Sequence, residues 1–316
     1  MNRAAALLFA VLVATAPAVA QTTSCAIPGT NNDFLGIQTV RLWPGPAPQA
    51  TGTTCFDIPA ITIMAPRQGS ANGSGVVIFP GGGYGMLAGD LEGREVADWF
   101  TARGFTAFIV SYRLTSHGYV MPVPLLDARR AIQTVRARAA DYHISPDRIV
   151  IIGFSAGGHL AALASTESVP GDPDAQDAID RVSSRPDYVV LGYPWLGAIG
   201  PDTTHLNYCK EYKLMDQCAQ LTQDYSPDLH VTKETPPTFI YHTFDDQTVP
   251  VEQSLRYYDA LVKAGVQSEL HVFAHGEHGS GLGEGDPALD QWPALLENWL
   301  RAMGLMTPES ASQRVR

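Results

Sequence analysis

The sequence is poor in charge and lacks the features that mark several protein classes. Only 17% of its 316 residues are charged, against 45% hydrophobic residues, a balance that disfavours a disordered chain or a coiled coil. It shows no internal repeat and no run of Lys or Arg, and 21 basic residues face 32 acidic ones for a net charge of −11. Nucleic acid and anionic membrane surfaces are therefore poor candidate partners, and a neutral substrate fits better.

Long hydrophobic runs are scarce as well. The most extended one, residues 4–14, is too short to span a bilayer. Arg3 precedes this run, and Ala18–Ala20 follows it as a small-x-small cleavage pattern. We expect residues 1–20 to be a cleaved secretory signal, and the mature protein to be soluble, secreted or periplasmic, with no membrane contact after cleavage. A retained N-terminal anchor is the alternative.

Cysteine is rare too, with four residues in the chain. An even number in an exported protein suggests two disulfides, for which three connectivities exist. Pairing between neighbours, Cys25–Cys55 and Cys209–Cys218, gives the shortest loops and is the pairing we prefer. A metal site is less expected, because the spacings contain no close Cys-x-x-Cys pair.

From Gly75 onward, short β-branched runs alternate with segments of helical periodicity. Nearly continuous apolar strands separated by amphipathic helices predict an α/β fold, with a parallel sheet covered on both faces. Two earlier stretches, Gly36–Leu42 and Ile58–Met64, are candidates for antiparallel edge strands. The expected strands are Val76–Phe79, Thr106–Tyr112, Arg148–Gly153, Tyr188–Gly192, Thr238–Thr243 and Glu269–Phe273. The expected helices are Leu91–Arg103, Leu125–Ala140, Ala156–Ser165, Val251–Ala264 and Ala288–Met303.

The mature chain, residues 21–316, is expected to form a single domain. Trp195–Pro237 is the longest stretch without a clear strand pattern, and it contains the second cysteine pair. Because segments of this kind are often lids or binding loops, we expect a lid-like insertion at about 195–237. The residues from Thr307 resemble a frayed tail.

Ser155 stands between a predicted strand and a predicted helix, in "IVIIGFSAGGHLAAL" (Ile149–Leu163). A sharp turn there would point the serine away from the sheet. Side chains two positions before and after it would collide, which explains Gly153 and Gly157. The helix would direct its unpaired amides and positive dipole end to the same point. These are the features of a nucleophile elbow, although Gly-x-Ser-x-Gly also arises by chance in a glycine-rich chain.

A serine needs a base and an acid to become a nucleophile, and both residue types follow in the chain. "YHTFDDQTVP" places Asp245 and Asp246 just after a predicted buried strand. "FAHGEHGSGLG" places His275 and His278 after the last predicted strand. Catalytic groups collect at the carboxyl edge of open α/β sheets, so one residue of each pair is expected beside Ser155.

A glycine-rich loop, "IFPGGGYG", follows the predicted strand that ends at Phe79. Successive glycines allow backbone amides to approach a bound oxyanion without interference from side chains. We expect Gly82 or Gly83 to supply one N–H group of an oxyanion hole and Ala156 to supply the other. A flexible turn is the alternative. A phosphate-binding loop is less expected, because no Gly-Lys-Ser/Thr follows.

Taken together, these segments resemble the α/β-hydrolase superfamily, in particular its exported acetyl xylan esterase and feruloyl esterase branch. The matching stretches are "LWPGPAP", "PGGGYG", "SPDRIVIIGFSAGGHLAAL", "FDDQTVPVEQS" and "HGEHGSGL". The resemblance implies a mostly parallel central sheet with helices on both faces. It also implies that Ser155 is the nucleophile, Asp246 the acid and His278 the base. The neighbours Asp245 and His275 offer rival assignments.

The function we expect is that of a serine carboxylesterase acting through an acyl-enzyme, without a metal or organic cofactor. Its substrate would be a small-molecule or polysaccharide ester, with acetyl or feruloyl groups on xylan as the leading case. An exported serine peptidase of the same fold and a noncatalytic binding protein on a hydrolase scaffold are the alternatives. The oligomeric state stays open.

Other polar and aromatic residues near predicted strand ends have less specific roles. Tyr84, Tyr193 and Trp195 are candidates for stacking against a sugar or ferulate ring, with core or rim packing as the alternative. His159, one helical turn after Ser155, is expected to be structural. Three charged residues are expected to anchor loops or helices by ion pairing, namely Glu92, Arg113 and Asp127.

Overall fold

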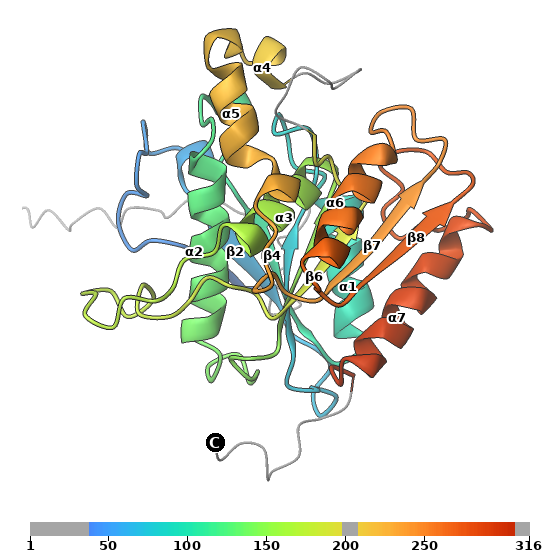
Figure 1. The fold of residues 1–316 in the computed structure, drawn as a ribbon. Coiled ribbons are helices and arrows are strands. Elements are labelled where there is room, and N and C mark those ends of the chain that lie inside the picture. Colours follow the sequence, from blue (N-terminus) through green and yellow to red (C-terminus); the bar gives the residue numbers. More distant parts are fainter. Residues whose placement is uncertain (1–37, 198–207, 307–316) are drawn as a thin grey trace, which may run out of the picture.

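The computed structural model describes residues 38–197 and 208–306 (Figure 1). The expected signal peptide at 1–20, the cysteine at position 25 and the tail from 307 lie outside these residues. Among the helices of the two described ranges, none has the length and hydropathy of a membrane span.

The core of the fold is a sheet with the strand order β1-β2-β4-β3-β5-β6-β7-β8. β1 and β2 are antiparallel additions at one edge, and β3 to β8 run parallel. The mostly parallel sheet and the edge strands are therefore as predicted. The strands are β1 (Gln38–Arg41), β2 (Ala60–Met64), β3 (Gly75–Phe79), β4 (Thr106–Ser111), β5 (Ile149–Phe154), β6 (Tyr188–Gly192), β7 (Thr238–Thr243) and β8 (Ser268–Phe273).

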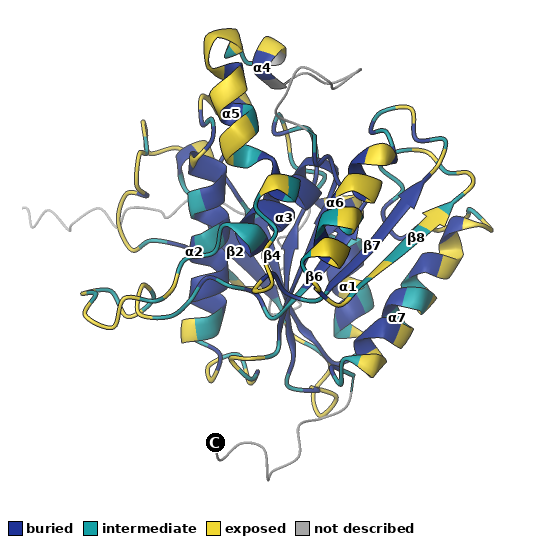
Figure 2. Cartoon of the chain, in the orientation of Figure 1, coloured by how far each residue is buried: buried dark blue, intermediate teal, exposed yellow. Residues whose placement is uncertain are grey.

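Helices cover both faces of the sheet (Figure 1). Successive strand residues point to opposite faces. Accordingly, Val77 and Ile151 pack in the cluster formed with α2, α3 and α6, whereas Val76 and Ile152 pack in the cluster formed with α1 and α7. Figure 2 shows the resulting pattern, in which the central strands and the inward helix faces are buried. The helices are α1 (Glu95–Thr101), α2 (Val123–Ala137), α3 (Ser155–Thr166), α6 (Glu252–Lys263) and α7 (Trp292–Ala302).

Helix boundaries differ from the predicted ones by a few residues. α2 begins at Val123 because Pro124 fits the first helical turn, where its missing N–H group is not needed. The first predicted helix consists of a π-helical turn, Asp90–Arg94, followed by α1. A 3₁₀ turn, Leu289–Gln291, similarly precedes α7.

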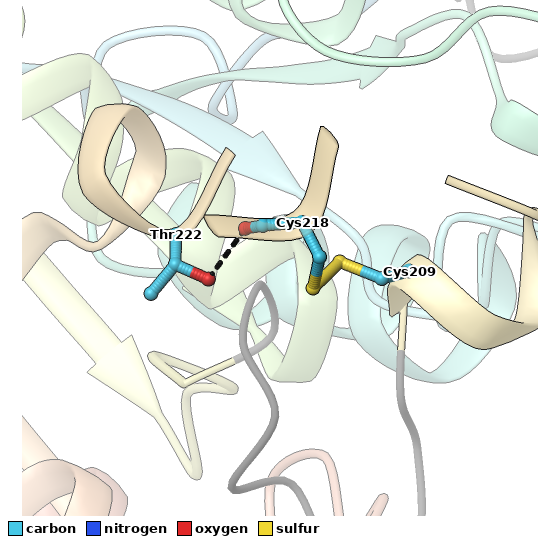
Figure 3. The surroundings of a disulfide bond; sticks show 3 residues. All are labelled: Cys209, Cys218 and Thr222. Atoms are coloured by element: carbon cyan, nitrogen blue, oxygen red, sulfur yellow. Dashed lines mark hydrogen bonds between the residues drawn. A yellow bond between two sulfur atoms is a disulfide. The ribbon is translucent and has the colours of Figure 1, made fainter. Parts of the chain in front are cut away.

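The segment at 195–237 contains helices that the sequence pattern did not predict. In its described part, α4 (Tyr208–Glu211) and α5 (Cys218–Tyr225) lie together beyond one end of α2 and α3 (Figure 1). The predicted Cys209–Cys218 disulfide is present, and the Thr222 hydroxyl donates a hydrogen bond to the Cys218 carbonyl at 2.8 Å (Figure 3). Cys55 is also disulfide-bonded, while its predicted partner lies outside the described residues.

Candidate active site

Ser155 is the first residue of α3 and directly follows β5. Its backbone has a φ of +51°, in the left-handed region that non-glycine residues rarely adopt. The expected steric reason for the flanking glycines is confirmed. A Cβ atom on Gly157 would lie 2.1 Å from the Phe79 carbonyl oxygen, and one on Gly153 would lie 2.1 Å from the Gly157 carbonyl oxygen. Glycine is therefore required at position 153 by the strand-to-helix turn and at position 157 by the close approach of α3 to the end of β3.

The structure brings Ser155, His278 and Asp246 into one hydrogen-bonded line. The Ser155 Oγ atom lies 2.8 Å from His278 Nε2, and His278 Nδ1 lies 2.7 Å from Asp246 Oδ2. Ser155 is 6% exposed, the His278 side chain 16% and the Asp246 side chain 0%. This series of hydrogen bonds thus begins at the buried Asp246 carboxylate and ends at the His278 imidazole and the Ser155 hydroxyl, which are partly accessible.

Asp246 is held as an ionised carboxylate by several donors. Its Oδ1 atom accepts hydrogen bonds from the backbone N–H groups of Thr248 and Val249, both at 2.8 Å. Its Oδ2 atom also lies 3.3 Å from His242 Nε2. That nitrogen carries a proton, because it also faces the Val249 carbonyl at 3.0 Å, which can only accept. Although burial opposes them, hydrogen bonds from His242 and His278 lower the pKa of Asp246 well below its usual value.

An ionised Asp246 determines the tautomer of His278. Because the carboxylate only accepts, His278 Nδ1 must carry the proton that lies between the two side chains. The lone pair of His278 Nε2 then faces the Ser155 hydroxyl, which donates to it. This is the arrangement of a general base positioned on a hydroxyl nucleophile.

The two rival residues form a separate pair. His275 Nδ1 lies 3.0 Å from Asp245 Oδ2, and Asp245 Oδ1 accepts a hydrogen bond from the Gly276 N–H group at 2.9 Å. The side chain of His275 is 82% exposed. The structure therefore places these residues at the surface and in contact with each other, whereas Asp246 and His278 contact the line that leads to Ser155.

The glycine-rich loop after β3 is held in an open turn. Gly82 has a φ of +123°, and a Cβ atom there would lie 2.4 Å from the Met86 carbonyl oxygen, so only glycine fits. The N–H groups of Gly82 and Gly83 donate to no acceptor within the described residues. Ala156, the second residue of α3, belongs to the first helical turn, whose N–H groups lack intrahelical acceptors. These three predicted donors are thus available to a bound oxyanion.

The three aromatic side chains predicted to stack against substrate are buried instead. Tyr84, Tyr193 and Trp195 are 0%, 1% and 1% exposed. The Tyr84 hydroxyl lies 2.7 Å from Nδ1 of His159, which fits the structural role expected of that histidine. None of the three rings is accessible to a sugar or ferulate ring, so interior packing, the alternative reading, replaces stacking.

The expected ion pairing holds for Arg113 and Asp127 but not for Glu92. The guanidinium of Arg113 contacts the Asp127 carboxylate at 2.7 Å and 2.9 Å, with both side chains buried. Glu92 instead accepts hydrogen bonds from the Gly81 N–H group at 2.6 Å and from the Tyr193 hydroxyl at 2.7 Å. The prediction of an ion pair is wrong at this position, because uncharged donors satisfy the carboxyl group.

Two residues of the site were not singled out from the sequence. His242 lies in the quoted "YHTFDDQTVP" stretch, and an imidazole inside a fully buried strand is the signal that could have identified it. Tyr212, from the 195–237 segment, donates a hydrogen bond to the Gly83 carbonyl at 2.9 Å. No local pattern predicts this second contact, which joins parts of the chain 129 residues apart.

A cavity of about 620 Å³ opens beside His278. Its lining residues include Asp245, Gln247, Glu277 and Asp286, whereas Ser155 and the glycine-rich loop are not among them. The carboxylates at this position would repel an anion, and the carboxylate and amide groups can both form hydrogen bonds with hydroxyl groups. The surroundings of the imidazole therefore suit an uncharged, hydroxyl-rich molecule.

Comparison with known proteins gives consistent matches. A family model described as BD-FAE matches residues 61–261. The acetylxylan esterase of Xylanibacter ruminicola is 32% identical over 237 residues, which cover 73% of this chain and 46% of that protein. The chain thus spans about half the length of this curated relative.

Solved structures agree over nearly the whole chain. An acetyl ester-xyloside bifunctional hydrolase from Caldicellulosiruptor lactoaceticus is 36% identical, with a TM-score of 0.75 and coverage of 85% of this chain and 97% of that chain. The esterase Est2 from Thermogutta terrifontis, bound to propionate, is 26% identical, with a TM-score of 0.70 and coverage of 88% and 98%. These matches confirm the predicted α/β-hydrolase fold.

Proposed function

The chain belongs to the BD-FAE family, and from this membership and the site geometry we propose that it is a serine carboxylesterase. Its substrates would be short-chain acyl esters, in particular acetyl or feruloyl esters on plant polysaccharide such as xylan. The observation that carries the proposal is the hydrogen-bonded line from Ser155 through His278 to Asp246, next to backbone N–H groups without acceptors.

In the proposed reaction, His278 Nε2 takes the proton of Ser155 as Oγ attacks the ester carbonyl. Asp246 stabilises the imidazolium that forms and keeps Nδ1 protonated. The N–H groups of Gly82 or Gly83 and of Ala156 stabilise the oxyanion, and each donor contributes about 3 kcal/mol. His278 then returns the proton to the leaving alcohol, an acyl-enzyme remains, and water attacks it by the same steps. The chain's own groups are sufficient for each step.

Two observations support a carbohydrate ester as substrate. The cavity beside His278 has polar and acidic lining residues, which favour a neutral, hydroxyl-bearing alcohol over an anion. Proteins similar to this chain include an acetylxylan esterase and an acetyl ester-xyloside hydrolase. A polysaccharide substrate also fits an exported enzyme, and the Cys209–Cys218 disulfide fits an oxidising compartment such as the periplasm or the medium.

The test compares the wild-type protein with Ser155→Ala on p-nitrophenyl acetate, acetylated xylan and methyl ferulate. Wild type should release acetate or ferulate, and Ser155→Ala should reduce turnover to background while its melting temperature stays close to that of wild type. Retained turnover in Ser155→Ala would refute the role of the serine. Cleavage of an aminoacyl p-nitroanilide in preference to the esters would favour a peptidase, and failure to react with a fluorophosphonate would favour a binding protein.

A further inference from the structure

Glu92 is a buried carboxyl group that the proposed reaction does not yet use. It lies in the π-helical turn Asp90–Arg94 and is only 3% exposed. Within the described residues, no Lys or Arg lies within ion-pair distance of its carboxyl group. Burying a carboxyl group without a cationic partner costs folding free energy, which suggests that Glu92 has a role beyond packing.

The hydrogen bonds of Glu92 join two loops of the candidate site. Its Oε2 atom accepts from the N–H group of Gly81, which begins the glycine-rich loop, at 2.6 Å. Its Oε1 atom accepts from the Tyr193 hydroxyl at 2.7 Å. The same hydroxyl accepts from the N–H group of Gly281 at 2.9 Å, three residues beyond His278. One carboxyl group therefore connects the oxyanion loop with the loop that carries the base.

Tyr193 also brings this connection into contact with the imidazole. Its ring lies against the ring of His278 with centroids 5.0 Å apart and an interplanar angle of 64°. Both oxygens of Glu92 accept hydrogen bonds, which stabilises the ionised form of the carboxyl group. A negative charge behind the Tyr193 ring stabilises the positive charge that His278 acquires during the reaction.

We propose that Glu92 is a positioning residue of the esterase site: it fixes the oxyanion loop and the His278 loop relative to each other and favours the protonated form of His278. This inference rests on the proposed function. The group is close enough for its ionisation to be coupled to the site. Burial raises the pKa of Glu92 above its usual value, and hydrogen bonds from Tyr193 and Gly81 and a positive charge on His278 offset only part of this effect. Coupling of this kind is reciprocal, so Glu92 must favour the imidazolium in return.

The buried tyrosines around Glu92, and Asp246 beside His278, keep the same charge near neutral pH. Tyr112 and Tyr241 are buried, and burial raises the pKa of each, so both stay uncharged near neutral pH. Burial raises the pKa of Tyr193 in the same way. Asp246, on the other side of His278, stays ionised throughout the assay range. A change in the pH dependence on substitution of Glu92 therefore reports its own charge.

The experiment separates charge from geometry with two variants and a matched control. Glu92→Gln keeps the size of the side chain and removes its charge, whereas Glu92→Asp keeps the charge and shortens the reach. Glu95→Gln makes the same charge change one turn away, on a half-buried residue without a described hydrogen bond to the site. The readouts are kcat, KM and the pH profile of kcat/KM with p-nitrophenyl acetate, together with melting temperatures.

Glu92→Gln should lower kcat by about tenfold and move the acid-side midpoint of the profile about one pH unit lower, because the base then protonates less readily. KM should change less than about twofold, since the contact is made to the protein rather than to substrate. Glu92→Asp should lower kcat by about tenfold with an unmoved midpoint, because a displaced loop misaligns the reacting groups. Glu95→Gln should match wild type in both readouts.

Each variant can overturn the inference. If the acid-side midpoint of Glu92→Gln equals that of wild type, Glu92 does not favour the protonated form of His278. If the kcat of Glu92→Asp equals that of wild type, Glu92 does not position the two loops. If the wild-type protein hydrolyses no ester, the proposed function fails, but the His278 imidazole can still be titrated by NMR. Its midpoint should be about one pH unit lower in Glu92→Gln than in wild type, and equal midpoints would overturn the link independently of activity.

Discussion

Replacing Asp246 with Asn tests the proposed role of the acid most directly. The carboxylate accepts two backbone hydrogen bonds at Oδ1, and its Oδ2 atom faces the imidazoles of His278 and His242. An Asn side chain has the same shape, and its one oxygen can keep the bonds to the N–H groups of Thr248 and Val249. Its NH₂ group then points at His278 and His242, where the structure needs an acceptor.

The magnitude follows from the tautomer that this substitution imposes. With a donor opposite Nδ1, His278 must place its proton on Nε2, which faces Ser155 at 2.8 Å. The lone pair that should take the serine proton is then absent. Asn in place of the acid of a Ser-His-Asp triad lowers kcat by about 10⁴-fold, which corresponds to about 5.5 kcal/mol of transition-state stabilisation. We expect a loss of that size, with little change in KM.

The assay is p-nitrophenyl acetate hydrolysis, and the neighbouring residue supplies the control. Asp245→Asn removes the same charge one position away, from a carboxylate that pairs with the exposed His275. Among the described residues, the side chains of the Asp245–His275 pair form no hydrogen bond with the hydrogen-bonded residues that lead to Ser155. The kcat of Asp245→Asn should therefore stay within about threefold of wild type. An Asp246→Asn variant with more than a tenth of wild-type kcat would refute the reasoning, and so would an equal loss in both variants.

Two further substitutions test the structural roles. Asp127→Ala removes one partner of the buried pair with Arg113 and should cost about 3–5 kcal/mol of unfolding free energy in urea, and a cost below about 1 kcal/mol would show that the pair is not needed. Tyr84→Phe removes the hydroxyl bonded to His159 and should cost about 1–3 kcal/mol without raising KM for acetylated xylan. A raised KM with unchanged stability would restore the discarded prediction that Tyr84 contacts substrate.

The sheet could be predicted from the sequence because buried parallel strands are distinctive. Segments such as Ile149–Phe154 are apolar at every position, since helices cover both faces. α4 and α5 could not be predicted in the same way. They are four and eight residues long, too short for a clear helical period, and the Cys209–Cys218 disulfide supports the segment in place of an extended buried face.

The candidate site could be predicted only where local sequence determines local geometry. Ser155 could be located because Gly153 is required by a contact within the turn, where a Cβ atom would meet the Gly157 carbonyl oxygen. The choice between Asp245 and Asp246 depends on which carboxylate faces His278, since Asp245 faces the imidazole of His275 instead. The aromatic residues were placed at the correct edge of the sheet, but Tyr84 and Tyr193 have positive φ values, and a strand pattern does not show which way such side chains turn.

Sheet order explains why the site needs a connection such as the one through Glu92. The glycine-rich loop follows β3 and Ser155 follows β5, and these strands are neighbours, so topology alone brings the oxyanion donors to the nucleophile. His278 follows β8, three strands from β5, a separation of about 14 Å at the usual strand spacing. Its loop must therefore fold back across the ends of β7 and β6. Tyr193 follows β6, on this return path, and bonds Gly281 on one side and Glu92 on the other. The loop that carries the base is thus bound to the end of β6, one strand from β5, and through Glu92 to the oxyanion loop.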